Sequence, residues 1–529
     1  MDITADTRAG VARRPPLPLI LAAVVPAALV LVPIGITVAD AAGADFARLI
    51  AVLWRPLVGE LLLNTVMLTV TGALCCTLLG TATALLIERT DIPFGGLWTA
   101  LATAPLAIPA FIASYAWVSI SASLEGFAGA LIVTVLSYTP LVFLPVAAAL
   151  RGLDPALEEI GRTLGHGPWR CLFRIMLPQL RPAMQGGALL VALNIMVEFG
   201  AFALMRFRTF TTEIYTAYRA GFDGAAAEAL AVVLLTLCVA CITAEALLRR
   251  RAHYARIGSG TRRRALRYAL GRWRLPALAA PALLAALAIG VPVLTILFWM
   301  TRHGAQAITP AEASPVALLH ATLSTIELGI GGALLTTLLA LPIALLSVRW
   351  PRFALTLPIE RSAWLAQGVP GIVIALALIT ATARALPFIY QSTFLLLIGY
   401  VVLFLPFPLV ALRASLLQIA PRLEEIARTL GANWFGALWR IVIPLAAPGF
   451  TAAAALVFIA VSTELTATLL LAPIGTQTLA IQIWNDTSSV AFAAAAPYAA
   501  VLVALSMAAT WVLGRRFGVG TLSHAPDEG

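Results

Sequence analysis

The nine residues LEEIGRTLG at Leu157–Gly165 return as LEEIARTLG at Leu423–Gly431, with a single difference, in the second half of the chain. The spacing downstream is repeated as well, because an isoleucine, Ile175 or Ile441, follows the last glycine of each copy at the same interval. Both copies are polar, arginine-bearing segments between long apolar runs. They are too charged to cross a bilayer, so we expect paired cytoplasmic loops in a duplicated membrane protein.

Each copy has the features of a short helix. Pro155 and Pro421 stand where a helix can begin, since proline is tolerated in the first turn, and two glutamates follow near the positive end of the helix. Apolar residues recur at intervals of three and four, which predicts an amphipathic helix that a glycine ends. A helix this short needs a partner for its apolar stripe, either the protein's own membrane helices or a second protein. The stripe comprises Leu157, Ile160 and Leu164 in the first copy and Leu423, Ile426 and Leu430 in the second.

The repeated pattern E-x-x-x-x-x-G-x₉-I-x-L-P resembles the EAA motif of permeases from binding-protein-dependent ABC importers. The matching residues are Glu159, Gly165, Ile175, Leu177 and Pro178 in the first copy, and Glu425, Gly431, Ile441 and Pro444 in the second, where Ile443 replaces leucine. Gly161 and Ala427 fall where the motif's name has alanine, each after an isoleucine. In that family the loop is a coupling helix that docks into a groove of a cytoplasmic ATPase. The resemblance therefore assigns ATPase coupling to Glu158, Glu159, Gly165, Glu424, Glu425 and Gly431.

The composition is that of a membrane protein with many spans. Of 529 residues, 61% are apolar and 11% are charged, and the mean hydropathy is +0.94, which excludes a soluble globular protein. Apolar runs of about 20 residues, the length that spans a bilayer as a helix, occur about twelve times, half of them in each repeat. We therefore expect an all-α membrane protein, a tandem duplication of the six-helix unit of ABC-importer permeases.

The predicted organisation has five parts. Residues 1–18 form a cytoplasmic N-terminal tail, 19–248 the first permease half, 249–274 a basic cytoplasmic linker, 275–514 the second half and 515–529 a cytoplasmic C-terminal tail. The first span is too long for a secretory signal peptide, so we expect an uncleaved anchor. The linker has two clusters of arginines around Gly-Ser-Gly, and we interpret it as a flexible, solvated tether whose arginines attract anionic membrane lipid.

All 35 basic residues are arginine, and most of them fall on one side of the predicted spans. This bias predicts that both termini are cytoplasmic, and it accounts for the net charge of +10 without a nucleic-acid partner. Because lysine is absent, the phosphate-binding loop G-x-x-x-x-G-K-[ST] cannot occur. We expect ATP and Mg²⁺ to be bound by a partner ATPase, and no cofactor in this chain.

The cysteines and histidines of the chain are scattered. Cys238 and Cys241 form C-x-x-C, but they lie inside an apolar run without nearby histidine, as small packing residues do. We therefore expect neither a metal site nor a catalytic site.

The third and ninth predicted spans carry prolines among small residues, Pro105 and Pro109 in one and Pro370 in the other. Proline permits kinks in membrane helices, and small residues permit close approach between helices. A gated transport pathway would need both properties, and ordinary helix packing uses them too.

Two carboxylates fall inside predicted spans. Glu198 and Glu464 each follow the second glutamate of their motif at the same interval, in the otherwise apolar fifth span of each half. An ionisable group in a span faces a cavity or a partner, because an unpaired charge there is costly. One interpretation places both carboxylates on a solute pathway between the halves, and the other makes each a packing residue bonded to a neighbouring polar group.

The segments Val197–Tyr218 and Thr463–Asn485 resemble the segments that follow the fifth spans in fused permeases of ferric-iron importers. The resemblance covers nearly the whole chain in length and order of elements. It implies a bacterial inner-membrane protein that takes ferric iron from an external solute-binding protein and works with two copies of an ATPase. Related permeases for thiamine, polyamines or aminoethylphosphonate share the architecture.

Two other classes of protein fit parts of the sequence. A proton-coupled secondary transporter would also have twelve spans and intramembrane carboxylates, but it would have no use for two docking loops. A membrane enzyme is disfavoured because neither a nucleophile motif nor H-E-x-x-H occurs. We therefore expect a transport subunit without an ATPase site of its own.

Overall fold

The computed structural model describes residues 14–43, 51, 54–250, 267–302 and 314–516. Over these residues the regular structure is helical, apart from one β-bridge between Thr90 and Tyr268. The prediction of an all-α protein is confirmed. Most of the predicted tails 1–18 and 515–529, and the part of the linker at 251–266, lie outside the described residues.

The number of apolar helices agrees with the predicted number of spans. Nine helices in the described part of the chain are long and apolar enough to cross a membrane, and counting each of three bent helix pairs as one span raises the total to 12. The predicted multi-pass membrane protein is therefore confirmed.

The two sharpest bends lie at the prolines of the third and ninth predicted spans. One bend, of 89°, precedes α5 (Ala110–Ile120) at Pro109, and the other, of 109°, precedes α18 (Gly371–Ala385) at Pro370. Both prolines have an extended backbone, with ψ of 143° and 138°. Proline has no N–H to donate to the preceding turn, so each span breaks into two helices at this point.

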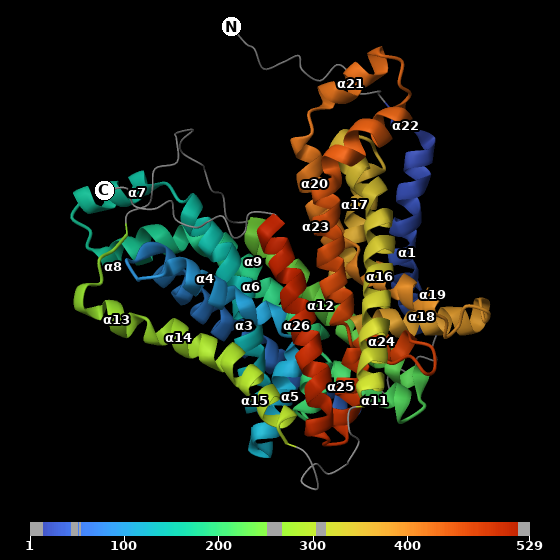
Figure 1. Ribbon diagram of the computed structural model, residues 1–529, viewed down its shortest axis with the longest axis horizontal. Helices are drawn as coiled ribbons and strands as arrows, with labels where there is room; N and C mark the ends of the chain where they lie inside the picture. Colours follow the sequence, from blue (N-terminus) through green and yellow to red (C-terminus); the bar gives the residue numbers. More distant parts are fainter. Residues whose placement is uncertain (1–13, 44–50, 52–53, 251–266, 303–313, 517–529) are drawn as a thin grey trace. The chain divides into compact units, whose positions relative to one another are not determined.

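The described helices form two compact units (Figure 1), and α25 (Leu479–Ser488) and α26 (Phe492–Arg516) are divided between them. Unit 1 contains α1 (Leu17–Gly43), α16 (Pro315–Arg349), α17 (Thr356–Leu365), η6 (Ala366–Gly368), α18, α19 (Thr393–Phe404), α20 (Pro406–Gln418), α21 (Pro421–Thr429), α22 (Trp434–Ala437), η7 (Leu438–Val442), α23 (Ile443–Ser462) and α24 (Thr466–Leu471). Unit 2 contains α3 (Pro56–Arg89), α4 (Gly95–Thr103), η1 (Ala104–Ala107), α5, η2 (Ala122–Leu124), α6 (Phe127–Gly152), α7 (Pro155–Thr163), α8 (Pro168–Cys171), η3 (Leu172–Met176), α9 (Leu177–Val197), α10 (Gly200–Leu204), α11 (Phe210–Arg219), α12 (Gly224–Arg250), η4 (Gly271–Trp273), α13 (Arg274–Ala277), α14 (Ala279–Ala285), η5 (Ala286–Gly290) and α15 (Val291–Met300).

The compact units do not follow the order of the sequence. In unit 1, α1 from the start of the chain packs against α16, α17 and α18 (Figure 1), and Arg384 of α18 donates a hydrogen bond to Asp40 of α1 over 2.6 Å. In unit 2, α14 and α15 pack against α4 and α5. The first span of each sequence half therefore packs with helices of the other half. The predicted halves 19–248 and 275–514 describe the sequence repeat, and their use as domain boundaries stays a prediction.

The core of unit 2 depends on close approach between helices α3, α6 and α9. A Cβ atom at Gly187 of α9 would lie 2.8 Å from the Cα of Val142 on α6. A Cβ atom at Gly80 of α3 would lie 2.9 Å from the Cβ of the same valine. These glycines let the backbones approach within a distance that any side chain would prevent.

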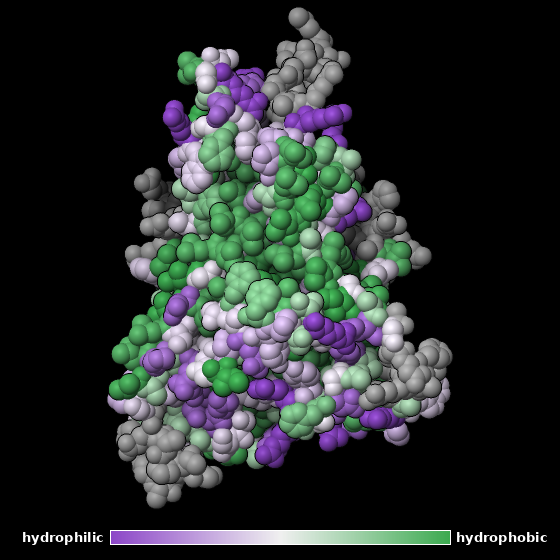
Figure 2. Space-filling view, turned by 90° about the vertical axis from the view of Figure 1, so that its right-hand side faces the viewer, coloured by the Kyte–Doolittle hydropathy of each residue, from purple (hydrophilic) through white to green (hydrophobic). Residues whose placement is uncertain are grey.

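Apolar side chains also cover the outer faces of the long helices. On α16 the exposed apolar residues recur about once per turn, as a stripe facing lipid would. On the face drawn in Figure 2, apolar residues gather between areas rich in polar residues. The exposed stripe of α16 comprises Leu319, Leu323, Ile330, Leu334 and Leu338.

We predict that Gly187→Ala destabilises the protein by about 1–3 kcal/mol, the usual effect of overpacking a core, because the new methyl group would meet the backbone of α6. The matched control is Gly59→Ala in α3, where a Cβ atom has nothing within 4 Å. The apparent melting temperatures of the purified variants in detergent measure the difference. Equal melting temperatures for the two variants would contradict the packing argument.

Candidate functional site

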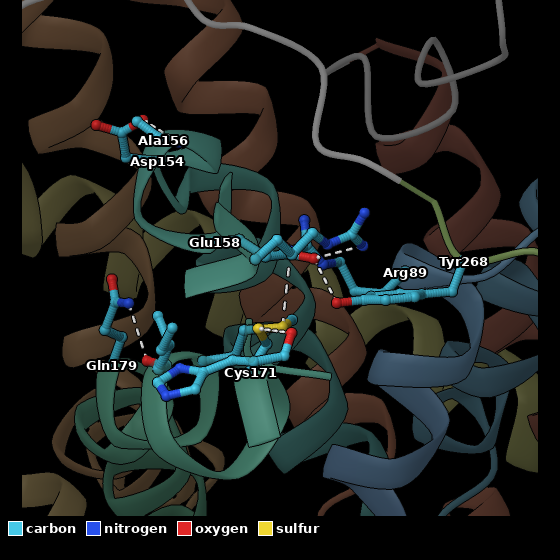
Figure 3. A network of polar contacts seen from close by, with 11 residues as sticks. Arg89, Asp154, Ala156, Glu158, Cys171, Gln179 and Tyr268 are labelled. Atoms are coloured by element: carbon cyan, nitrogen blue, oxygen red, sulfur yellow. Dashed lines mark hydrogen bonds and ion pairs between the residues drawn. The ribbon is translucent and has the colours of Figure 1, made fainter. Parts of the chain in front are cut away.

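The repeated motif forms two short helices with the predicted limits. Helix α7 begins at Pro155 and α21 begins at Pro421, each with the proline in the first turn. Asp154 caps α7, since its side chain accepts a hydrogen bond from the N–H of Ala156 over 3.0 Å (Figure 3). The corresponding residue before α21 is Ala420, which provides no side-chain cap.

A glycine in the left-handed conformation follows each helix. Gly165 has φ of 79° and Gly431 has φ of 89°, values that a residue with a side chain adopts only with strain. In the first copy, the N–H of Gly165 donates to the carbonyl of Arg162 over 2.9 Å, and the N–H of His166 donates to that of Gly161 over 3.0 Å. The second copy repeats both bonds. This is the Schellman ending of a helix, and it turns the chain back toward the membrane helices.

Glu158 of α7 is buried in an ion pair. It is 2% exposed, and its carboxylate accepts a hydrogen bond from Arg89, which is 4% exposed and ends α3 (Figure 3). Arg162, one turn further along α7, approaches the same carboxylate to 3.1 Å. A buried charge is stable only when it is paired, so the carboxylate holds α7 against the end of α3.

The second copy has the same arrangement in unit 1. Arg349 ends α16, and its guanidinium lies 2.7 Å from the carboxylate of Glu424, the first glutamate of the second motif. Arg349 also donates to the carbonyl of Ile419, just before α21, over 3.2 Å. Each motif helix is therefore tied by its first glutamate to the last residue of a long membrane helix.

The motif itself does not indicate these two arginines. The interval from Arg89 to Glu158 is shorter than the interval from Arg349 to Glu424, so a comparison of the two copies at a fixed offset does not find them. A shared local pattern would have found them, since both arginines end the sequence A-L-L-x-x-R at the close of an apolar run.

The second glutamate of each motif lies in a different environment from the first. Glu159 is exposed and Glu425 is half-buried. Neighbouring positions on a helix point about 100° apart, so two adjacent identical residues have different partners. Their assignment to ATPase coupling, like that of Glu158, Glu424 and the two glycines, stays a prediction.

The apolar stripe of each motif helix is largely exposed. Ile160 and Leu164 are 55% and 72% exposed, and the equivalent Ile426 and Leu430 are 55% and 82% exposed. An exposed pair of aromatic rings follows each helix, with ring centroids 6.2 Å apart in the first copy and 5.9 Å apart in the second. The four aliphatic side chains are therefore not covered by the described membrane helices. We call this set the apolar face: Ile160, Leu164, Trp169 and Phe173, with Ile426, Leu430, Phe435 and Trp439.

A π-helical turn joins each loop to the next span. The turns η3 and η7 occupy equivalent positions in the two repeats, and one residue separates the end of each turn from a motif proline, Pro178 or Pro444. Because proline cannot donate a backbone hydrogen bond and collides with the carbonyl one turn before it, the preceding turn widens. The proline of the motif thus sets how the loop meets the span.

The end of the predicted linker is not a solvated tether. The N–H of Tyr268 donates to the carbonyl of Arg89 over 2.8 Å, and the N–H of Asp91 donates to the carbonyl of Tyr268 over 3.2 Å. The N–H of Leu270 donates to the Asp91 carboxylate over 2.9 Å. The interpretation of 249–274 as a tether is therefore wrong at Tyr268 and Leu270, because the backbone groups of these two residues pair with Arg89 and Asp91 at the end of α3.

Glu198 and Glu464 each cap a short helix within their own unit. Glu198 accepts hydrogen bonds from the hydroxyl of Tyr138 over 2.6 Å and from the N–H of Ala201, in α10, over 2.9 Å. Glu464 accepts from the N–H of Ala467, in α24, over 2.9 Å. These bonds agree with the interpretation as packing residues, and a role on a solute pathway stays a prediction.

Among the described residues, no group of three or more His, Cys, Asp or Glu side chains is arranged to hold a metal ion. Cys238 is buried, Cys241 is half-buried, and both are free thiols.

The site is thus a pair of exposed amphipathic helices, one in each sequence repeat and each fixed to a membrane helix, which is the arrangement of a duplicated transport permease. A family model described as "binding-protein-dependent transport system inner membrane component" matches residues 76–254 and 337–518. The chain belongs to this family. Both matches begin after the first span of their half, so the spans that pack with the other half's helices lie outside the matched repeat.

Three similar proteins cover different shares of the chain. The Fe(3+)-transport system permease protein FbpB 2 of Haemophilus influenzae is 36% identical over 496 residues, which is 93% of this chain and 97% of that protein. The ferric transport system permease protein FbpB of Actinobacillus pleuropneumoniae is 26% identical over 74% of this chain and 59% of its own length. The molybdate/tungstate transport system permease protein WtpB of Thermococcus kodakarensis is 25% identical over 36% of this chain and 79% of its own.

We predict that Glu158→Ala destabilises the permease by about 3–5 kcal/mol, because it leaves the guanidinium of Arg89 buried without its partner. Glu159→Ala, one residue away on the exposed surface, should change stability by less than about 0.5 kcal/mol. Apparent melting temperatures in detergent separate the two variants. The double variant Arg89→Met/Glu158→Met should be more stable than Glu158→Ala; if it is not, the ion pair is not the cause.

Proposed function

We propose that this chain is the complete permease of an ATP-driven importer for ferric iron, with both permease halves in one polypeptide. Membership of the family supports the role as a membrane component that depends on a binding protein. Ferric iron is favoured because the relative that covers 93% of the chain carries Fe(3+) transport in its name, whereas the molybdate/tungstate relative covers 36%. Thiamine, polyamines and aminoethylphosphonate are the alternative solutes.

The partners in this proposal are an external solute-binding protein and two copies of a cytoplasmic ATPase. The observation that carries the ATPase part is the apolar face, which occurs once on each motif helix and is exposed in both copies. One ATPase subunit would dock on α7 and the other on α21. The ATPases would bind ATP and Mg²⁺, and this chain would contribute no ATPase site and no cofactor.

The ion pairs suggest how movement of the ATPases would reach the membrane helices. ATP-driven closure would bring α7 and α21 together. Because Arg89 ends α3 and Arg349 ends α16, a displacement of either motif helix would act directly on a membrane span. The spans would then switch the pathway from inward-facing to outward-facing.

The proposed location is the inner membrane of a bacterium, with both termini and both motif helices in the cytoplasm. The excess of arginine in the segments on the side of the motif helices supports this orientation. The solute-binding protein would deliver its cargo to the opposite side.

We predict that Leu164→Asp/Leu430→Asp weakens binding of the ATPase at least about tenfold, because a charge would replace an apolar anchor on each copy of the apolar face. The control Leu164→Met/Leu430→Met keeps the face apolar and should bind normally. Co-purification of the ATPase with each permease variant, at matched membrane abundance, measures the effect. Wild-type co-purification of the aspartate variant would remove the docking role.

We predict ATP-dependent accumulation of radiolabelled Fe³⁺ by proteoliposomes that contain the permease, its ATPase and an iron-loaded binding protein. Uptake of molybdate or thiamine in place of iron would overturn the choice of solute and leave the permease role intact. The same assay tests the carboxylates, because Glu198→Gln and Glu464→Gln remove the charge and keep one side-chain oxygen that can accept the N–H of each short helix. Wild-type uptake by the double variant would end the pathway role.

A further inference from the structure

The predicted linker contacts the first motif helix through a side chain in its described part. Tyr268, near the end of the predicted linker, donates a hydrogen bond from its hydroxyl to the carboxylate of Glu158 (Figure 3). The guanidinium of Arg162 lies over the same ring, 4.9 Å from its centroid. The ring and the hydroxyl therefore hold two residues that are one turn apart on α7.

The backbone of Tyr268 is held as firmly as its side chain. It forms the one β-bridge of the described chain, to Thr90, which directly follows Arg89. Asp91 accepts the N–H of Leu270 and lies 4.0 Å from the guanidinium of Arg274. The backbone of Tyr268 is thus held to the end of α3, and Arg274 at the start of α13 is held to the same segment.

The electrostatics of the contact agree with its geometry. Burial and the nearby carboxylate of Glu158 raise the pKa of Tyr268. The hydroxyl therefore keeps its proton and acts as a hydrogen-bond donor to the carboxylate. With Arg89 on one oxygen and Tyr268 and Arg162 on the other, both oxygens of the buried carboxylate have partners.

We propose that Tyr268 is a positioning residue that sets the orientation of α7, so that the segment joining the halves takes part in ATPase coupling. The proposal rests on the docking role proposed above for the apolar face. Arg89 holds one oxygen of the Glu158 carboxylate at the end of α3. Tyr268 holds the other oxygen and also lies against Arg162 one turn further along α7, so its contacts at two points of the helix restrict the direction in which Ile160 and Leu164 point. Most of the segment before α1, which would be its counterpart in the repeat, lies outside the described residues.

The proposal is tested first on the full-length permease in nanodiscs, without any ATPase. A nitroxide is placed at position 164 or, as the matched control, at position 430, in a chain whose native cysteines are alanine. Tyr268→Ala should raise the mobile fraction of the label at 164 about tenfold, the effect expected from losing a hydrogen bond to a charged group, and leave the label at 430 unchanged. Tyr268→Phe, which keeps the ring beside Arg162, should give an intermediate value. Unchanged spectra at 164 would overturn the proposal.

The second test uses the assembled transporter with native cysteines and compares the solute imported per ATP hydrolysed at equal amounts of folded complex. We expect this ratio to fall several-fold for Tyr268→Ala and less for Tyr268→Phe, with Tyr390→Ala, an exposed residue of unit 1, as the control. A residue that only stabilises the fold would lower the yield and leave the ratio unchanged, and that outcome would overturn the positioning role. A wild-type permease that fails to bind its ATPase would instead refute the docking function, so the two failures are distinguishable.

Discussion

A carboxylate withdrawn from water needs a cation beside it, and Glu158 meets this requirement with Arg89 at the end of α3. The pair joins a short motif helix to a long membrane helix. It fixes the position of the short helix. A helix as short as α7 is not stable by itself in water. Its proline, its glycine and its aspartate cap define its length, and the ion pair defines its place. The apolar face can therefore remain exposed without the helix collapsing onto the membrane spans.

The second motif helix is fixed to a membrane helix in the same way, although it has no side-chain cap. Helix α21 lacks a side-chain cap at its start, yet it begins and ends at the equivalent prolines and glycines. Glu424 is paired with Arg349 although the intervening chain is longer than in the first copy. What the duplication has kept is the ion pair, the left-handed glycine and the exposed stripe. The length of chain between the paired residues has changed.

The local features of the motif helices could be predicted from the sequence, because proline, glycine and apolar spacing act over a few residues. The limits of α7 and α21 and the breaks at Pro109 and Pro370 are of this kind. Long-range pairings could not be predicted in the same way. Two adjacent glutamates in LEEI carry no sign of which one will be buried, since that depends on an arginine in a distant part of the sequence. Likewise, an apolar span can pack against any other apolar span, so the sequence did not indicate that α1 would join the helices of the second half.

The two adjacent glutamates of the motif lie in different environments, although the resemblance assigns the same coupling role to both. Both carboxylate oxygens of Glu158 are bonded within the permease, to Arg89, Arg162 and Tyr268, so neither is available to a partner protein. Glu159 lies on the exposed side of the same turn, where it can meet an ATPase without any change in α7. In the proposed function, a substitution at the first position would abolish coupling by releasing the helix, and one at the second by altering the contact with the ATPase. Loss of transport alone cannot distinguish the two causes, whereas the stability of the isolated permease does.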